Sequence, residues 1–371
     1  MKLETYKEKL NEQWERTGLE VAPHTSVNSL LYPGNFCYCL DEIEIYNKYK
    51  SFIEIGEEHY QKMQPAIRIA DFKKLGNAPM NHLGQFSIAT INGFNSVYSE
   101  DGRNQYEQSV KNMFGFMNSL GLEQSKICVS YFSGNDAKSI EASRKSDEQK
   151  RKIIFDRFIP EDDLREVLLE NGLDESQLIP NKTRDNYLTS AWYVTKAPWG
   201  YRNEIFYELP KGELLDIGTI ERLVAKPIIE KEFFKDRKGY DHIVTDLLDW
   251  EMNLLIDATG VERIIQAIEG KDSIFQIEAY KPFMDLGYPP IVIEAGKIAH
   301  RVFSDAKFGD LSRHRKGVIK EVIRNLNPLT STELRRILET NAEVYICLYP
   351  ELKNTIEKTI EEIEAYRKRC N

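Results

Sequence analysis

The chain has 371 residues, of which 41% are hydrophobic and 29% are charged, and its formal net charge is −9. This composition is ordinary for a globular protein of one or two domains, and the negative charge argues against a general nucleic-acid coat, because such proteins are usually basic. No apolar run approaches the length of a membrane span, and the charged N-terminus lacks the features of a signal or transit peptide. We therefore expect a cytoplasmic protein without a membrane anchor.

The spacing of the cysteines does not match that of a structural metal site. Five cysteines are scattered, and Cys37-x-Cys39 has no matching second pair, so we expect neither a zinc site nor a disulfide framework. Two basic clusters, at residues 313–316 and 367–369, either face an anionic partner or are solvated helix faces.

The first half of the chain alternates helical and strand patterns. Residues 3–18 predict an amphipathic helix that ends at Gly18. Residues 64–69 and 86–94 predict two strands of a hairpin, with Arg68 on the first arm. A helix over 104–120, a strand over 127–132 and a helix over 162–170 are expected to follow.

The second half turns from strands to helices. Residues 203–209 and 214–220 alternate as a hairpin, and 240–253 predict a helix or an extended run. A strand at 254–256, a tight turn at 257–260 and a helix from Val261 come next. The remaining helices are expected over 274–285, 294–304, 315–326, 331–341 and 351–369. We expect two domains, a mixed antiparallel-sheet domain over 1–270 and a helical domain over 271–371.

The junction before the helix at Val261 is a candidate anion site. Glu262 and Arg263 lie where backbone N–H groups and the helix dipole favour a negative charge. An arginine there can hold a phosphate or stack on a flat ring. The alternative is a helix N-terminus with an exposed ion pair, which the Gly-x-Glu-Arg string favours when it is taken alone.

Several strings in the chain resemble the catalytic core of alanyl-tRNA synthetase, a class II aminoacyl-tRNA synthetase. They occur in the family's order: Ser29 to Asn35 for the first motif, Gln64-x-x-Ile67-Arg68 with Asp71, Gly76 and His82 for the second, Asp185-Asn186-Tyr187, Pro198-x-Gly200-x-x-x-Glu204-Ile205-Phe206-Tyr207, Gly260-Val261-Glu262-Arg263 for the third, and Tyr349-Pro350-Glu351-Leu352. Coincidence in all of them is far less credible than in any one.

The resemblance implies an α+β fold, with a class II synthetase-like antiparallel β-sheet flanked by helices and followed by a helical domain. It implies a ligase that uses ATP and Mg²⁺ to convert an amino acid into an aminoacyl-adenylate and then transfers the acyl group. We expect a stand-alone paralogue without the family's editing and C-terminal domains.

The resemblance also assigns an ATP site. Arg68 would bridge the α-phosphate and the amino-acid carboxylate, where charge develops during attack, and Arg263 would hold the γ-phosphate or the adenine. His82 and Glu204 would complete the site, with Glu204 contacting Mg²⁺ or the ribose. The alternatives are a surface hairpin arginine for Arg68 and a half-exposed strand glutamate for Glu204.

The expected amino-acid pocket departs from the family's pattern. Its residues would be Trp192, Thr219, Glu221, Asp257 and Gly260. Asp257 would bind the α-ammonium of the substrate, although the spacing between Asp257 and Arg263 is one residue shorter than in the family's motif. Trp192 is either the pocket tryptophan or a core residue. A glycine at position 218 replaces a pocket tryptophan, which we interpret as added volume. Glu221 adds a charge that is either paired or faces solvent.

The sequence leaves alternatives for the identity of the acyl acceptor and of the activated amino acid. The segment between Asp305 and Lys316 is shorter than the family's acceptor-binding helices, so the acceptor is either tRNA or a carrier protein, peptide or metabolite. The amino acid would be alanine or another small one. A different reading is a non-catalytic paralogue that binds an amino acid or nucleotide as a regulator or subunit; retention of both Arg68 and Arg263 favours the enzyme.

Overall fold

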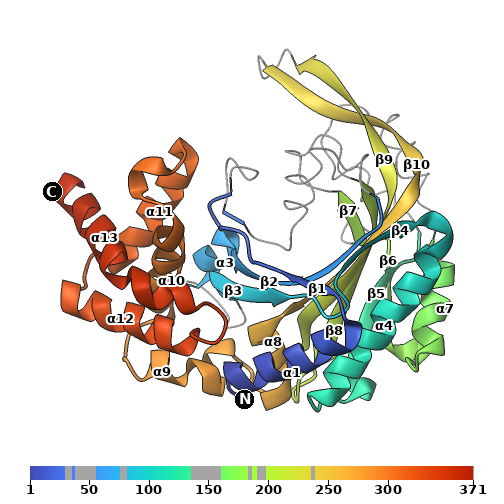
Figure 1. Cartoon of the computed structure of the whole chain (residues 1–371), viewed down its shortest axis with the longest axis horizontal. Coiled ribbons are helices and arrows are strands. Elements are labelled where there is room, and N and C mark those ends of the chain that lie inside the picture. Colours follow the sequence, from blue (N-terminus) through green and yellow to red (C-terminus); the bar gives the residue numbers. More distant parts are fainter. Residues whose placement is uncertain are drawn as a thin grey trace.

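A computed structural model describes residues 1–29, 36–37, 56–75, 82–134, 160–182, 186–189, 198–234 and 239–370. A twisted sheet forms the centre, helices pack under it, and the C-terminal helices form a separate group at one end (Figure 1). Residues 30–35, 76–81 and 190–197, which include Trp192 and parts of two matched strings, lie outside the described residues.

The described strands form one ten-stranded sheet in the order β1-β2-β3-β10-β9-β8-β5-β6, with β4 pairing β2 and β10, and β7 pairing β8. The strands are β1 (Glu20–Ala22), β2 (Glu58–Ile67), β3 (Gln85–Ala89), β4 (Phe94–Tyr98), β5 (Ile127–Phe132), β6 (Leu178–Asn181), β7 (Tyr187–Thr189), β8 (Trp199–Glu208), β9 (Leu214–Phe234) and β10 (Gly239–Gly260). Among these pairs, β1–β2 and β5–β6 are parallel, and the central pairs are antiparallel.

Helices cover the lower side of the sheet in Figure 1. They are α1 (Leu3–Thr17), α4 (Gly102–Ser119), α7 (Asp162–Glu170) and α8 (Val261–Glu269). Tyr6, Leu10 and Trp14 recur at helical spacing on α1 and are buried. The helix ends at Gly18, whose φ of 67° is left-handed and whose N–H donates to the Trp14 carbonyl.

The C-terminal helices enclose a second core beside the sheet. They are α9 (Lys281–Met284), α10 (Pro290–Asp305), α11 (Arg313–Leu326), α12 (Ser331–Val344) and α13 (Ile356–Cys370). Ile298, Ile319, Ile337 and Ile363 pack together there and are fully buried. The predicted α+β fold, an antiparallel sheet flanked by helices and followed by a helical region, is confirmed. In the described part of the chain, no helix combines the length and apolar character needed to cross a bilayer.

Two predicted connections are wrong. The tight turn at 257–260 is extended, because β10 continues to Gly260 and α8 begins at the next residue. Strand β10 pairs with β9 on one side and with β4 and β3 on the other, and these ladders keep its last residues extended. The single strand expected over 86–94 is two strands, β3 and β4, separated by a turn in which Gly93 has a φ of 99°.

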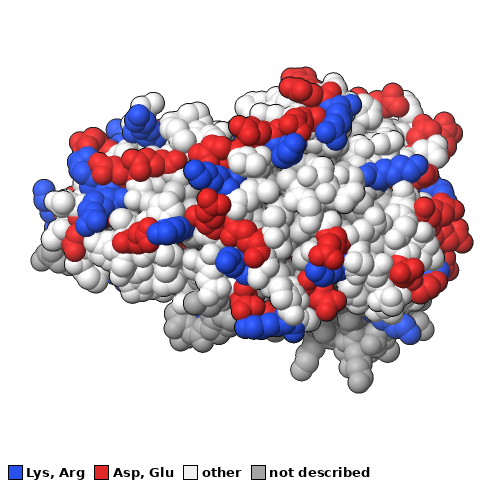
Figure 2. All heavy atoms as spheres, turned by 90° about the horizontal axis from the view of Figure 1, so that it is seen from below, with Lys and Arg blue, Asp and Glu red and all other residues white. Residues whose placement is uncertain are grey.

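The lower face is mixed in charge. Figure 2 shows acidic and basic side chains interspersed over it, without a patch of one sign. On this view of the described residues, neither sign of charge dominates the face.

A buried carboxyl group lies under strand β8. Glu161 is 1% exposed; its carboxyl accepts the Phe132 N–H at 2.7 Å and the Asn203 side-chain N–H at 3.3 Å. Burial raises its pKa to about 8, against these hydrogen bonds, which act in the opposite direction. Asn203 lies between Arg202 and Glu204 on β8, so this contact helps to fix the strand from below.

We predict that Glu161 makes the protein less stable as the pH rises from about 4.5 to about 8. In that window the unfolded chain has released the proton that the folded chain retains, so the stabilisation is full below the lower value and is lost through the upper one. Denaturant unfolding across this range should show a smaller decline for Glu161→Gln. Glu166→Gln, on the exposed side of α7, is the control. If the free energy of unfolding declined equally in the wild type, Glu161→Gln and Glu166→Gln, the prediction would be contradicted.

Candidate active site

The upper side of the sheet carries charged residues on neighbouring strands. Arg202 and Glu204 are two residues apart on β8, and they pair in register with Glu221 and Thr219 on β9. Side chains of registered antiparallel pairs point to the same side. The four side chains therefore share one face, opposite the helices of the lower side.

Arg68 is placed at this face by the end of β2. Its backbone N–H donates to the Gly84 carbonyl at 2.9 Å, and it is the residue before α3 (Ile69–Lys74). Its guanidinium carbon lies 4.9 Å from the centroid of the Phe86 ring, a cation–π contact. The side chain is therefore held in place on the sheet, unlike a free surface arginine.

Arg263 reaches the same place from the first turn of α8. Its Nη1 donates to the Asp216 carbonyl at 3.1 Å and to the Asp216 carboxylate, and its other guanidinium nitrogens make no hydrogen bond within the described residues. Arg263, Gly260, Asp71 and Phe86 line one small pocket. Two arginines that are far apart in the sequence thus meet at the Phe86 ring.

Two like charges meet at this place. Burial lowers the pKa of Arg68, and the charge of Arg263 lowers it further, with a smaller contribution from Arg202. Asp71 and Asp216 act in the opposite direction. An anion bound between the guanidinium groups would relieve the repulsion between Arg68 and Arg263.

His82 lies beside the pocket. Its Nδ1 is 3.5 Å from a carboxylate oxygen of Asp71. Burial lowers the pKa of His82, Asp71 opposes that shift, and Arg263 and Arg68 add to it. The imidazole is therefore biased towards its neutral form, in which one ring nitrogen can accept a hydrogen bond.

Arg202 lies between two carboxylates. Its Nη2 is 3.7 Å from Glu204 and its Nε is 3.6 Å from Glu221. The Glu221 side chain is only 15% exposed, so the solvent-facing alternative is wrong. Burial raises the pKa of Glu221, with Arg202 opposing the shift and Glu204 adding to it. Opposite Glu204, the Thr219 hydroxyl is buried and has no hydrogen-bond partner within the described residues.

Three residues of this site were missed in the sequence, namely Arg202, Asp216 and Phe86. Arg202 had a usable signal, because it precedes Glu204 by two residues on a predicted strand and must share its face. Asp216 and Phe86 carry no such signal, since their roles depend on where α8 and β2 meet the sheet.

Gly218 does not enlarge the pocket. A Cβ at this position would lie 2.6 Å from the Ala258 carbonyl oxygen, so the glycine is needed for the close approach of β9 and β10. The volume that we attributed to the missing tryptophan is taken by backbone.

Asp257 occupies a different place from the one that the resemblance implies. The residue is fully buried, and its carboxylate accepts backbone N–H groups of Ile91 at 2.7 Å, Asn92 at 2.6 Å and Gly93 at 3.4 Å. Because β10 is extended here, Asp257 points to the side opposite Ala258 and Gly260. It holds the β3–β4 turn and does not face the pocket.

A buried ion pair joins β3 to the C-terminal helices. Glu294 on α10 accepts the backbone N–H groups of Gly84 at 2.9 Å and Gln85 at 3.0 Å. Lys297 donates to the Glu294 carboxylate at 2.6 Å, to the Gln85 carbonyl at 3.0 Å and to the Tyr280 hydroxyl. Both charged side chains are fully buried. The carbonyl of Gly84, whose N–H is held here, accepts from the backbone of Arg68.

The same network continues to α8. The Tyr280 and Tyr345 hydroxyls are 3.2 Å apart, and Tyr345 donates to Glu262 at 2.9 Å. Glu262 also accepts the Ser87 N–H, with 2.9 Å to the nearer oxygen. Glu262 is thus a buried link between β3 and the helices, and the interpretation of Glu262 as part of an exposed ion pair is wrong. It fixes the first turn of α8, from which Arg263 extends.

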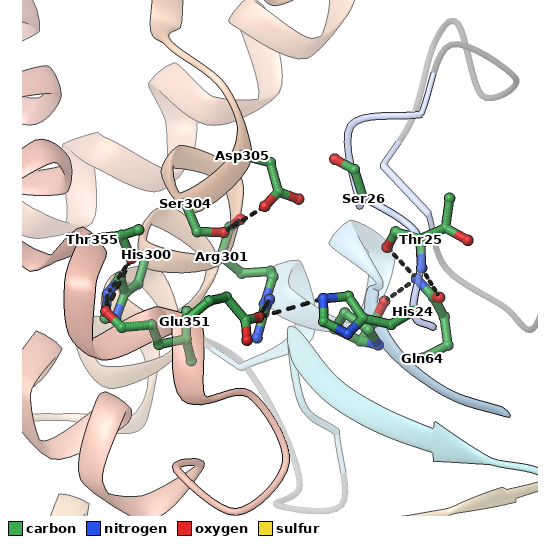
Figure 3. Close-up of polar contacts among 12 residues, drawn as sticks. His24, Thr25, Ser26, Gln64, His300, Arg301, Ser304, Asp305, Glu351 and Thr355 are labelled. Carbon is green, nitrogen blue, oxygen red and sulfur yellow. Dashed lines mark hydrogen bonds and ion pairs between the residues drawn. The ribbon is translucent and has the colours of Figure 1, made fainter. Parts of the chain in front are cut away.

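The matched string from Tyr349 to Leu352 forms another joint, and Figure 3 shows its Glu351 between Arg301 and His24. Glu351 accepts from Arg301 at 2.7 Å and lies 3.4 Å from His24 Nε2, and the Arg301 guanidinium stacks 4.2 Å from the Tyr349 ring centroid. Burial alone would raise the pKa of Glu351, but the hydrogen bonds from His24 and Arg301 lower it to about 2. The string ties the N-terminal segment to α10.

We predict that Lys297→Met lowers the free energy of unfolding by about 3–5 kcal/mol, because it leaves the Glu294 carboxylate buried without its counter-charge. The matched control is Lys281→Met, whose lysine pairs with Asp285 four residues later but is 68% exposed; its change should stay within about 0.5 kcal/mol. Urea unfolding measures both. Similar losses in the two variants would mean that burial of the pair is not what matters.

We predict that Asp257→Asn lowers the free energy of unfolding by about 1–3 kcal/mol. The backbone N–H groups of the turn are now shared between two carboxylate oxygens, whereas the amide of asparagine offers only one acceptor oxygen. Thermal or urea unfolding gives the value. An unchanged stability would argue that the carboxylate does not hold the β3–β4 turn.

Comparison with known proteins relates the chain to tRNA ligases. No family model matches it. The alanine–tRNA ligase of Schizosaccharomyces pombe is 23% identical to it over 172 residues, which cover 44% of this chain and 15% of that protein.

The comparison with solved structures found two weak similarities. One is to the apo histidyl-tRNA synthetase of S. aureus, with a TM-score of 0.39 and 11% identity over 74% of this chain and 67% of that one. The other is to the RNA-binding domain of threonyl-tRNA synthetase from Cryptosporidium parvum Iowa II, with a TM-score of 0.39 and 10% identity over 71% and 62% of the two chains. The chain therefore spans only a small part of the alanine ligase and about two thirds of these structures.

Proposed function

We propose that the chain is an adenylate-forming ligase of the class II aminoacyl-tRNA synthetase type. The observation that carries the proposal is the meeting of Arg68 and Arg263 at the Phe86 ring, where their charges repel each other. Two guanidinium groups with free donors form a site for a polyphosphate. The likeness to part of a tRNA ligase supports the same class of reaction.

In the proposed first step, a carboxylate oxygen of the amino acid attacks the α-phosphorus of ATP. The new C–O–P bond forms as the bond to pyrophosphate breaks, and pyrophosphate leaves. Arg68 would neutralise the charge that builds on the α-phosphate, and Arg263, held by Asp216, would orient the rest of the triphosphate. His82 would accept or donate a hydrogen bond at the edge of the same pocket.

Glu204 supplies the oxygen donors that Mg²⁺ prefers, and its carboxylate lies 3.7 Å from Arg202 Nη2. Bound there, Mg²⁺ would neutralise phosphate charge. Because Asp257 points away, we assign the α-ammonium to Glu221, with the Thr219 hydroxyl beside it and Gly260 at the floor of the pocket. Trp192 stays a proposed pocket residue outside the described residues.

In the proposed second step, a nucleophile of the acceptor attacks the acyl carbonyl and AMP leaves. The acceptor is either tRNA or a carrier protein, peptide or metabolite. Incubation with ATP, the activated labelled amino acid and total tRNA separates these classes. Label on the tRNA identifies the first, and stable adenylate with unlabelled tRNA identifies the second.

We predict amino-acid-dependent ATP–pyrophosphate exchange by the wild-type chain. Arg68→Ala and Arg263→Ala should each lower kcat/KM for exchange by about 10²–10³, because each removes a charged donor to the transition state. Arg103→Ala, an exposed arginine on α4 paired with Glu166 and Glu170, is the control and should retain the wild-type rate. If the wild-type chain shows no ATP–pyrophosphate exchange with any common amino acid, the proposal is rejected.

A second candidate is a non-catalytic paralogue that binds an amino acid or nucleotide. The position of Asp257 favours it, since the aspartate that the resemblance assigns to the substrate is used to hold a turn. ATP binding that depends on Arg68 and Arg263, without pyrophosphate exchange, would identify this alternative.

A further inference from the structure

A second hollow is lined by residues of α1, α4, the start of β2 and the β3–β4 turn. Helices α1 and α4 lie on the helix-covered side of the sheet (Figure 1). His59 lines it near the start of β2, whereas Arg68 follows the end of β2, so about 30 Å of extended backbone separates the two sites. The hollow has a volume of about 560 Å³, within the usual range for a small-molecule site. We call it the amide groove, because six carboxamide side chains line it: Gln13, Asn92, Asn95, Gln105, Gln108 and Asn112.

The floor of the amide groove is held by its own hydrogen bonds. Asn95 Oδ1 lies 2.9 Å from His59 Nδ1, Asn92 donates to the Ser109 hydroxyl at 3.0 Å, and Asn112 donates to Asn92. These contacts fix the orientation of the amides without using all of their donors and acceptors. The remaining groups form a rigid polar surface, which lowers the entropy cost of binding.

Two side chains at the groove have no polar partner within the described residues. Gln13 on α1 is only 5% exposed and makes no hydrogen bond there. Its amide atoms are not among the fully buried atoms that lack a partner, so they still reach the open space of the groove. Arg16, one helical turn further along α1, lines the groove as well and has no ion pair among the described residues. Both positions offer hydrogen bonds to a molecule in the groove.

Gly115 supports the same conclusion from α4. A glycine inside a helix costs about 1 kcal/mol relative to alanine. No atom lies within 4 Å of the place where its Cβ would be, so packing does not require the glycine. The missing side chain keeps the wall of the amide groove open.

The lining selects a chemical class. None of the described lining residues is acidic, so the ammonium group of an amino acid or polyamine would lack a counter-charge. The imidazole of His59 is the one aromatic ring among the described lining residues, so a nucleobase would find little stacking surface. Arg16 can hold a phosphate or carboxylate through two parallel hydrogen bonds, and carboxamides both donate and accept, as neighbouring hydroxyl groups require.

We propose that the amide groove binds a small polyhydroxylated anion, such as a sugar phosphate or a sugar acid. Arg16 holds the anionic group at the rim, and Gln13, Asn92, Asn95 and Gln105 bind the hydroxyl groups. This site is separate from the proposed adenylation site, and its occupancy requires neither ATP nor Arg68 and Arg263.

The test is calorimetric titration of the full chain with glucose 6-phosphate, glucuronate, glucose and inorganic phosphate. We expect at least one of the two anionic sugars to bind at millimolar or lower concentration, about tenfold or more tighter than glucose or phosphate. Glucose 6-phosphate alone identifies a sugar-phosphate site, and glucuronate alone identifies a sugar-acid site. Arg16→Met should weaken that binding about tenfold or more, whereas Arg336→Met, an exposed arginine on α12, should not.

Gly115→Leu should abolish binding by filling the groove, and Gly115→Ala separates this effect from a change in helix propensity. Three results would overturn the proposal: no binding of either anionic sugar at millimolar concentration, phosphate binding as tightly as glucose 6-phosphate, or binding that survives both Arg16→Met and Gly115→Leu. None of these readouts involves pyrophosphate exchange, so failure here leaves the adenylation proposal unaffected.

Discussion

The buried ion pair of Glu294 and Lys297 is the constraint on which the upper face depends. Two charges without solvent are stable only when each finds several partners, and here the partners are backbone groups at the start of β3 together with the Tyr280 hydroxyl. The pair therefore docks the C-terminal helices onto the sheet in one position. Through Tyr280, Tyr345 and Glu262 it also fixes the start of α8.

This docking explains how two remote arginines reach one place. The backbone of Arg68 is bonded to Gly84, whose own N–H is held by Glu294. Arg263 lies next to Glu262 on α8, and Glu262 is held by Tyr345 and Ser87. Both guanidinium groups are thus supported from below by the same network, while their free donors face the upper side. The site is preorganised by the helical region even where that region does not line it.

The two faces of the sheet have different chemistry. The upper face presents paired arginines and glutamates on adjacent strands, suited to phosphate, metal and ammonium groups. The lower side, between α1 and α4, presents mainly neutral amides together with Arg16, His59 and Lys111, which pairs with Glu107. Strand β2 runs between the two sites, since His59 lies near its start and Arg68 follows its end.

The sequence alone determined the periodic elements and the class of the fold. The limits of β5 and α7 agree with the predicted residues, because short apolar runs and an acidic first turn are local signals. The matched motifs predicted that Arg68 and Arg263 act as a pair. Their proximity follows because the chain has the order of strand, loop and helix that those motifs imply.

Only the tertiary structure decided which side each residue faces. Asp257 was expected in the pocket, but ladders on both sides keep β10 extended and turn its carboxylate to the opposite face. Gly218 was read as empty space, but the adjacent backbone of β10 fills it. One alternative placed Glu262 in an exposed ion pair, but the residue is buried and accepts a hydrogen bond from Tyr345, which follows α12. In each case the deciding contact comes from a segment remote in sequence, and local pattern carries no information about such a contact.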